Sequence, residues 1–474
     1  SLGVDNFGIY NVVGGVVAMF SILTGALSVA ISRDITFELG KGNKERLNKV
    51  FSSAVTIQMF MSIIIVIIAE IAGVWFLNNK MVIPEDRLYA ANWVLQFSIV
   101  SFVLTLISVP YNACIIAHEK MSAFAYITIY EAIMKLVVAY TVFITPFDKL
   151  ITYAALLLFI AFTMRLIYGV YCAKHFEECH YHFIFDKKML KQMGGFAGWT
   201  MIGNLAYVGY SQGLNILLNI FFGPSVNAAR GVAMQVNEKV SSFCTNFQMA
   251  LNPQITKSYA ANDLKRMHSL IFASSKYSFF LLLLLSLPIM IETKPILYYW
   301  LGNYPDHTIW FVRLIFMVLL VDATANPLTI AAQANGNIKK YQIIVGTILL
   351  LIVPIAYLAL KLGYQPEIVF VVHLIIVLIA QCARLIMING MISLAVKEYI
   401  KKVVLRIVAV VCSSVILPLS LHIYLPDGFL YMISICFISC ISVLISVYTL
   451  GLSGVERQKI HGKINNYIHR KNEN

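Results

Sequence analysis

Residues 51–77 read FSSAVTIQMFMSIIIVIIAEIAGVWFL, and Glu70 is the one charged residue among them. A helix needs about 20 consecutive, mainly apolar residues to cross the hydrocarbon core of a bilayer. This stretch is longer than that, and it lies between the basic segment 33–50 and the polar segment 78–87. It therefore predicts a membrane-spanning helix.

The same pattern continues along the chain of 474 residues, of which 59% are hydrophobic and 12% are charged. Soluble domains are about half apolar and about a quarter charged. The composition thus excludes a soluble enzyme, a nucleic-acid-binding module, a disordered scaffold and a secreted disulfide domain. We predict an all-α integral membrane protein with thirteen transmembrane helices. They are expected at about 8–32, 51–77, 88–118, 121–145, 149–173, 196–222, 224–252, 270–300, 307–333, 341–361, 366–391, 401–424 and 428–451.

Basic residues are distributed unequally between the two sides of the predicted membrane. The loops on one side and the C-terminal tail carry 23 lysines and arginines, whereas the alternate loops carry Lys80, Arg87, Lys149, Lys294 and Lys361. An excess of basic residues marks the cytoplasmic side. We therefore expect a multi-pass membrane protein with a cytoplasmic C-terminus.

A weak internal duplication relates residues 3–46 to residues 223–266, with Gly3 matching Gly223 and Arg46 matching Arg266. The chain starts at Ser1, and we expect a preceding helix, which would make fourteen. Each half then has six helices, and an even number makes the repeats parallel. The expected organisation is an N-terminal lobe at 1–173, a cytoplasmic loop at 174–195, a C-terminal lobe at 196–391, two extra helices at 392–451 and a basic cytoplasmic tail at 452–474.

Several charged residues fall inside the predicted spans, where a charge costs about 2.5–3.5 kcal/mol on insertion scales. Arg230, Lys239, Arg313 and Lys135 are therefore expected to face a cavity or a partner. Glu131 lies one helical turn before Lys135, so a neutralising ion pair is an equally good explanation for that lysine. Asp322 is a candidate ion-coupling site, as is Glu131, although a hydrogen-bonded structural aspartate is an open alternative for Asp322.

The helical pair 196–252 has the strongest local pattern. Its second helix is too polar to face lipid, so the pair is expected to line water or to pack inside protein. On its first helix, the polar residues recur at spacings of three and four and share one face. The predicted cavity-lining residues of the pair are Asn204, Tyr207, Ser211, Asn215 and Asn237.

The sequence offers one possible metal-binding cluster and no catalytic motif. His175, Cys179, His180 and His182 cluster in one predicted loop, but their spacing matches no standard zinc finger or ribbon. The sequence has no phosphate-binding P-loop and no nucleophile elbow. We therefore expect a non-enzyme without cofactor or metal, and no nucleic-acid partner.

Five segments resemble the O-antigen and capsular polysaccharide flippases of the multidrug/oligosaccharidyl-lipid/polysaccharide (MOP) exporter superfamily. They are 2–13 (LGVDNFGIYNVV), 37–43 (FELGKGN), 109–113 (VPYNA), 222–231 (FGPSVNAARG) and 252–259 (NPQITKSY). The resemblance extends over essentially the whole chain. It departs from the family in lacking the first helix.

The resemblance implies two six-helix lobes around a cationic cavity, followed by two C-terminal helices that match 401–424 and 428–451. It also implies translocation of an undecaprenyl-pyrophosphate-linked oligosaccharide from the cytoplasmic to the periplasmic leaflet by alternating access. Arg230 and Lys239, then Arg313 and Lys135, are the positions that suit the cationic cavity. Membrane lipid, Na⁺ or H⁺, and a polysaccharide polymerase or ligase are the further partners considered.

Two alternatives stay open. A multidrug antiporter coupled to Na⁺ or H⁺ would share the architecture but would more naturally have unpaired carboxylates than arginines in its cavity. A membrane glycan polymerase or ligase would need a long external loop with catalytic residues. The longest external loop expected here is about ten residues and has only Glu85, Asp86 and Arg87 as charges.

Overall fold

The fold is helical throughout the part of the chain that the structure describes. This computed structural model describes residues 6, 8–10, 13–14, 17, 20–81, 83–184, 186–426, 428–458 and 461–462, and no strand occurs among them. Within these described residues, ten helical segments have the length and the apolar composition needed to cross a membrane. The prediction of an all-α, multi-pass membrane protein is therefore confirmed.

Three of the thirteen predicted spans are not among those ten segments. The span 8–32 lies partly outside the described residues and continues into α2 (Ser21–Lys41). The spans 196–222 and 224–252 lie in α8 (Lys187–Phe222) and α9 (Pro224–Ala260), which have 36 and 37 residues. At a rise of 1.5 Å per residue both are long enough to cross a bilayer, but they are more polar than the ten.

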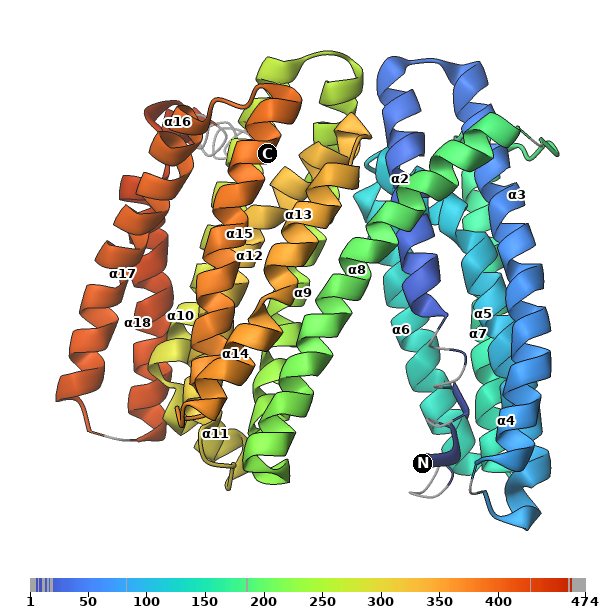
Figure 1. Ribbon diagram of the computed structural model, residues 1–474, viewed down its shortest axis with the longest axis horizontal. Coiled ribbons are helices and arrows are strands. Elements are labelled where there is room, and N and C mark those ends of the chain that lie inside the picture. The colour runs from blue at the N-terminus through green and yellow to red at the C-terminus, as the bar shows by residue number, and fades with distance from the viewer. Residues whose placement is uncertain are drawn as a thin grey trace, which may run out of the picture. The chain divides into compact units, whose positions relative to one another are not determined.

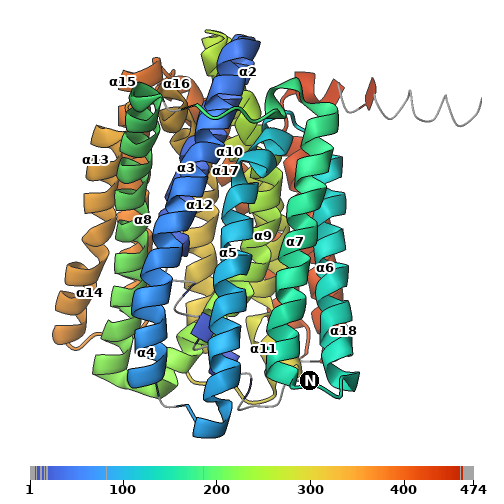
Figure 2. The same ribbon diagram turned by 90° about the vertical axis from the view of Figure 1, so that its right-hand side faces the viewer.

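The contacts divide the chain into two compact units, which are described separately. The first comprises residues 1–205 and 256–263. Figures 1 and 2 show its helices, which run roughly parallel to one another. Besides α2 and the beginning of α8 they are α3 (Lys44–Ile68), the π-helical turn η1 (Ala69–Gly73), α4 (Val74–Asn79), the 3₁₀ turn η2 (Glu85–Arg87), α5 (Leu88–Ala117), α6 (Met121–Ile144), α7 (Lys149–His175) and the 3₁₀ turn η3 (Glu177–Cys179).

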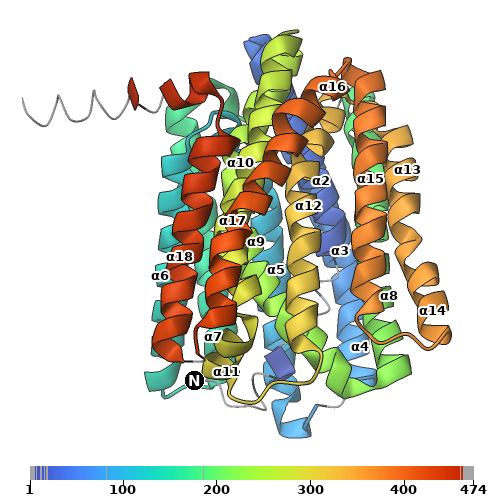
Figure 3. The ribbon, with the colours of Figure 1, turned by 90° about the vertical axis from the view of Figure 1, so that its left-hand side faces the viewer.

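The second unit comprises residues 206–255 and 264–474. Figure 3 shows α17 and α18 side by side, and α18 also packs against α10. Besides parts of α8 and α9 its elements are α10 (Leu264–Ile291), α11 (Thr293–Leu301), α12 (Thr308–Asn335), α13 (Lys339–Leu350), α14 (Ile352–Lys361), α15 (Ile368–Ile392), α16 (Val396–Tyr399), the π-helical turn η4 (Ile400–Val404), α17 (Leu405–Tyr424), α18 (Phe429–Ser446) and the π-helical turn η5 (Val447–Gly451).

The two units repeat the same packing order. In the first, α5 packs against α3 and α7, and α6 packs against α7; in the second, α12 packs against α10 and α15, and both α13 and α14 pack against α15. Pro110 of α5 and Pro327 of α12 lie at similar distances from the ends of their helices. The duplication that was weak in sequence is therefore clear in the packing.

Turn chemistry explains where the long helices end. Gly42 closes α2 with a left-handed backbone (φ 71°), and the side chain of Asn43 accepts a hydrogen bond from the Arg46 N–H at the start of α3. Gly223 (φ 79°) separates α8 from α9, and Pro224 is the first residue of α9. Glycine adopts positive φ at little cost, and proline suits a first helical turn because its missing N–H has no partner there.

The two extra C-terminal helices share the core of the second unit. Val410 of α17 and Val443 of α18 are buried in the same hydrophobic cluster as Phe311 and Phe316 of α12. In contrast, the outward faces are apolar and open, as shown by Ile386, whose side chain is 72% exposed. Such faces are suited to contact with lipid rather than water.

Candidate functional site

A polar pocket of about 210 Å³ lies inside the second unit, lined by α8, α9, α12 and α15. It brings together residues that are up to 166 positions apart in the chain, from Tyr207 to His373. We call it the Arg230 pocket. The predicted site residues that line it are Tyr207, Ser211, Arg230, Asn237 and Asp322.

Arg230 is held in this pocket by neutral groups of α8. Its Nη1 donates to Asn215 Oδ1 (3.2 Å), and its Nη2 donates to the backbone O (3.0 Å) and Oγ (3.3 Å) of Ser211. No carboxylate pairs with it among the described residues, and its buried Nε–H has no hydrogen-bond partner there. The guanidinium is thus positioned without being neutralised, as an anion-binding group requires.

Asp322, His373 and two tyrosines surround the other side of the pocket. The ring of Tyr210 packs edge-on against those of Tyr207 (5.3 Å between centroids) and His373 (5.1 Å). Within the described part of the chain, the buried atoms His373 Nε2 and Asn237 Oδ1 have no hydrogen-bond partner. Buried polar groups without partners are uncommon and point to a bound molecule or water.

The first unit has a second polar pocket of about 390 Å³ between α5, α6 and α7. The predicted ion pair is present there, with Lys135 Nζ 2.7 Å from Glu131 Oε1. A polar stripe on α5 lines the same pocket and was not predicted, although its residues recur in the sequence at spacings of four, three and four. That stripe consists of Ser101, Thr105, Ser108 and Asn112.

The remaining predicted residues do not line either pocket. Lys239 is exposed on α9 and has no ion pair among the described residues, and Asn204 is half-buried on α8. Arg313 donates through Nε to Met290 O (2.9 Å) and through Nη2 to Ile291 O (3.4 Å). It thus binds carbonyl groups of the last turn of α10, where Thr293 Oγ1 also donates to Met290 O (3.0 Å). This is a helix-capping arrangement and not part of the Arg230 pocket.

Two residues of the Arg230 pocket, Tyr210 and His373, were not among the predicted site residues. Tyr210 lies one turn after Tyr207 on α8, and His373 lies in the apolar run 366–391. A lone histidine in an apolar run is a usable signal, because ionisable residues in such runs are rare. Its proximity to Arg230 depends on how α15 packs, which no local pattern encodes.

Comparisons with known proteins identify the family. A model of the polysaccharide biosynthesis protein family matches residues 1–258, more than half of the chain. The chain belongs to this family. The comparison with curated proteins found no match for the chain.

Similarity to solved structures establishes the fold of the chain. A MATE transporter in its straight conformation is similar with a TM-score of 0.74 and 14% identity, over 84% of this chain and 90% of that one. The Vibrio cholerae MATE transporter VcmN in its bent form gives 0.66 and 18%, over 84% and 91%. A MOP superfamily transporter from Pyrococcus furiosus, described as having a binding pocket of reversed polarity, gives 0.68 and 14%, over 82% and 88%.

Proposed function

We propose that this protein translocates an undecaprenyl-pyrophosphate-linked oligosaccharide from the cytoplasmic to the periplasmic leaflet of a bacterial inner membrane. Membership of the polysaccharide biosynthesis family and the MATE fold support transport in polysaccharide assembly, by alternating access. The observation that carries the proposal is Arg230, a cation without an ion pair among the described residues, in a pocket lined by hydrogen-bonding side chains.

The pyrophosphate is the part of such a substrate that cannot cross the hydrocarbon core of the membrane without a protein. Desolvating an isolated ion in hydrocarbon costs tens of kcal/mol. A guanidinium offers paired N–H donors that match phosphate oxygens, and each hydrogen bond to a charged group contributes about 1.5–3 kcal/mol. Arg230 would bind the phosphate, while Tyr207, Ser211 and Asn237 would bind sugar hydroxyl groups, and the lipid tail would stay in the bilayer.

Lys135 and Lys239 are the next candidates for the substrate anion. Lys135 faces the first-unit pocket but is paired with Glu131, so an anion must compete with that carboxylate. Lys239 is exposed and has no such competitor among the described residues. Outward movement of an anion is also favoured by an inside-negative potential, by about 2.3 kcal/mol per charge per 100 mV.

The test is a translocation assay with fluorescent lipid-linked oligosaccharide in proteoliposomes. We expect Arg230→Ala to reduce translocation at least tenfold and Arg230→Lys to retain part of it, because lysine keeps the charge but not the paired donors. Lys401→Ala, at an exposed lysine of η4, is the matched control and should behave as wild type. Equal rates for Arg230→Ala and wild type would exclude Arg230 from substrate binding.

A cation-coupled drug antiporter is the second candidate, and Asp322 is the observation that favours it. This carboxylate lines the same pocket as Tyr207 and Tyr210, whose rings could hold an organic cation by cation–π contact. Drug efflux abolished by Asp322→Asn, with Arg230→Ala active, would establish this function. The opposite pattern would support the flippase.

We further propose that the protein is not an enzyme, that its C-terminus is cytoplasmic and that it works beside a polysaccharide polymerase or ligase. The cytoplasmic assignment rests on the distribution of the 36 lysines and arginines. A C-terminal green fluorescent protein fusion should fluoresce, and a C-terminal alkaline phosphatase fusion should be inactive. Active phosphatase would reverse the assigned orientation.

A further inference from the structure

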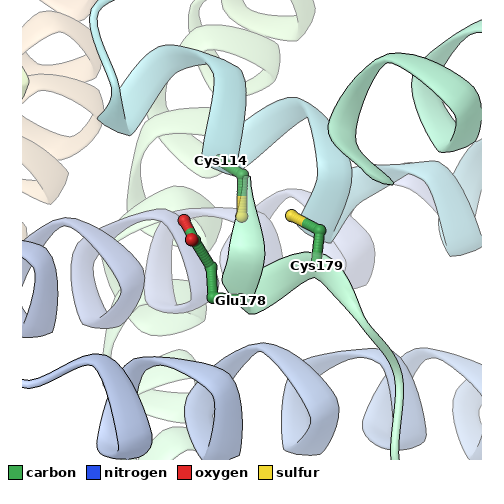
Figure 4. Close-up of side chains that lie close together, drawn as sticks. All are labelled: Cys114, Glu178 and Cys179. Atoms are coloured by element: carbon green, nitrogen blue, oxygen red, sulfur yellow. The ribbon is translucent and has the colours of Figure 1, made fainter. Parts of the chain in front are cut away.

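Three potential metal ligands lie together in the first unit, and none of them lines the pocket of Lys135. One ligand atom each from Cys114, Glu178 and Cys179 falls within 4.8 Å of the others, and all three residues are buried. Figure 4 shows the two thiols and the carboxylate turned towards a common point. Cys114 belongs to the last turn of α5, while Glu178 and Cys179 belong to η3, which follows α7.

Two more side chains with suitable chemistry adjoin this cluster. The thiol of Cys172 on α7 is fully buried, interacts with the Cys179 thiol and donates to Tyr111 O (3.4 Å). His118 Nε2 lies 2.5 Å from Glu178 Oε1, and its ring stacks on Phe176. The cluster therefore has three thiols, one carboxylate and an imidazole that holds the carboxylate in place.

The backbone that carries these ligands is fixed by other contacts. Asn48 Nδ2 on α3 donates to the carbonyl oxygens of Glu178 and His180, both at 2.9 Å. The hydrogen bond between His118 Nε2 and Glu178 Oε1 fixes the carboxylate itself. The carboxylate is therefore oriented without any contribution from an ion.

Zn²⁺ fits this set of donors. It takes thiolate, imidazole and carboxylate ligands in a tetrahedron, with Zn–S distances of about 2.3 Å that place sulfur atoms about 3.8 Å apart. The ligand atoms of Cys114, Glu178 and Cys179 would need to approach by at most about 1 Å, which side-chain rotation can provide. Cys172 is outside this set of three and would have to rotate further to bind. Zinc-binding carboxylates and imidazoles are commonly oriented by a second group, which is the position of His118.

We propose that Cys114, Cys179 and Glu178 bind Zn²⁺, with Cys172 as the fourth ligand and His118 as the group that positions Glu178. On binding, each cysteine releases its proton to solvent and becomes a thiolate. The charge of Arg165, which acts on Cys172, partly offsets the resulting negative charge. The ion would clamp the ends of α5 and α7 and the turn η3 together, which is a structural role.

The proposed ligands differ from the cluster of histidines and cysteine in the predicted loop, for which no metal was expected from the sequence. His175, His180 and His182 are exposed, and of the residues that cluster in the predicted loop only Cys179 is a ligand. The other proposed ligands are 58 to 65 positions from Cys114 and lie on other elements. Spacing rules for zinc fingers cannot detect such a site, because its ligands come from three separate elements.

The test is metal binding by the full chain, purified in detergent, reduced and stripped with a chelator. Wild type should bind one Zn²⁺, and Co²⁺ should give thiolate charge-transfer absorption. Cys114→Ser/Cys179→Ser should lose both signals, and His118→Ala should weaken affinity about 10- to 100-fold. Cys382→Ser/Cys412→Ser, at two exposed cysteines, is the matched control and should bind as wild type.

A readout without variants covers the case in which the double variant does not fold. Zn²⁺ should protect Cys114 and Cys179 of the wild-type protein from alkylation, as measured by peptide mass spectrometry, while Cys382 stays reactive. The proposal is overturned if wild type gives no thiolate–Co²⁺ absorption, if the double variant binds as wild type, or if Zn²⁺ gives no protection. A Cys114–Cys179 disulfide under reducing conditions would overturn it as well.

Discussion

Replacing Glu456 with glutamine should destabilise the second unit, because this carboxylate neutralises a buried lysine. Lys276 on α10 has a side chain only 5% exposed, and its Nζ donates to both carboxylate oxygens of Glu456, at 2.9 and 2.8 Å. Tyr277 Oη donates to Oε1 (2.7 Å), and the Ser453 N–H donates to Oε2 (2.6 Å). Glutamine at 456 removes the charge that compensates Lys276.

The expected loss of stability can be worked out from the pKa of the Glu456 carboxyl group. Burial raises the pKa of Glu456, but hydrogen bonds from Lys276, Ser453 and Tyr277 outweigh this and lower it from 4.5 to about 2. At about 1.36 kcal/mol per pH unit that difference corresponds to about 3.4 kcal/mol as an upper bound. The side chain is 27% exposed, so solvent screening reduces the expected loss to about 2 kcal/mol.

Thermal unfolding in detergent at several pH values is the assay. Since the pKa of Glu456 is lowered in the folded protein, its stabilising contribution is complete above about pH 4.5 and is lost as the pH falls towards 2. Wild type should therefore have the higher melting temperature at pH 7, and the gap between wild type and Glu456→Gln should shrink between pH 5 and pH 3.

Glu398→Gln is the matched control, because Glu398 pairs with Lys402 at 2.5 Å while both side chains are 55% exposed. Ion pairs this exposed contribute little to stability, so this variant should unfold near the wild-type temperature. If Glu456→Gln were no more destabilising than Glu398→Gln, or if its gap to wild type did not depend on pH, the reasoning about Lys276 would be wrong.

Three other substitutions and one truncation test separate parts of the structure. Arg313→Ala should lower the free energy of unfolding by about 1–2 kcal/mol, because it removes the hydrogen bonds that cap α10, and it should leave substrate affinity unchanged. A binding defect as large as that of Arg230→Ala would instead place Arg313 in the substrate site. Gly40→Val should destabilise by about 1–3 kcal/mol, because a Cβ there would lie 2.7 Å from Lys257 Cα, and a wild-type melting temperature would contradict this packing. Asp322→Asn should abolish any dependence of flipping on a Na⁺ or H⁺ gradient, which an unchanged gradient dependence would refute. Deleting the tail from residue 453 onwards should reproduce the loss seen for Glu456→Gln, and full stability of the truncated chain would argue against the contacts of Glu456 with α10.

Local patterns predicted much of this protein. Apolar runs such as 51–77 reveal membrane helices because crossing a bilayer is a matter of length and side-chain hydrophobicity, both of which are written along the chain. The pair Glu131–Lys135 was predictable for a similar reason, since residues four apart on a helix are neighbours whatever surrounds the helix. The short motifs were sufficient to indicate the family.

Tertiary packing decided which polar groups meet. Arg230 and Arg313 looked alike in sequence, as two arginines about two turns inside a span, yet one faces a pocket and the other caps a helix end. Lys276 with Glu456 and Cys114 with Cys179 are distant in sequence, and they meet only through the rotation and packing of whole helices. Helix rotation depends on the sum of many weak side-chain contacts, so no single stretch of sequence encodes it.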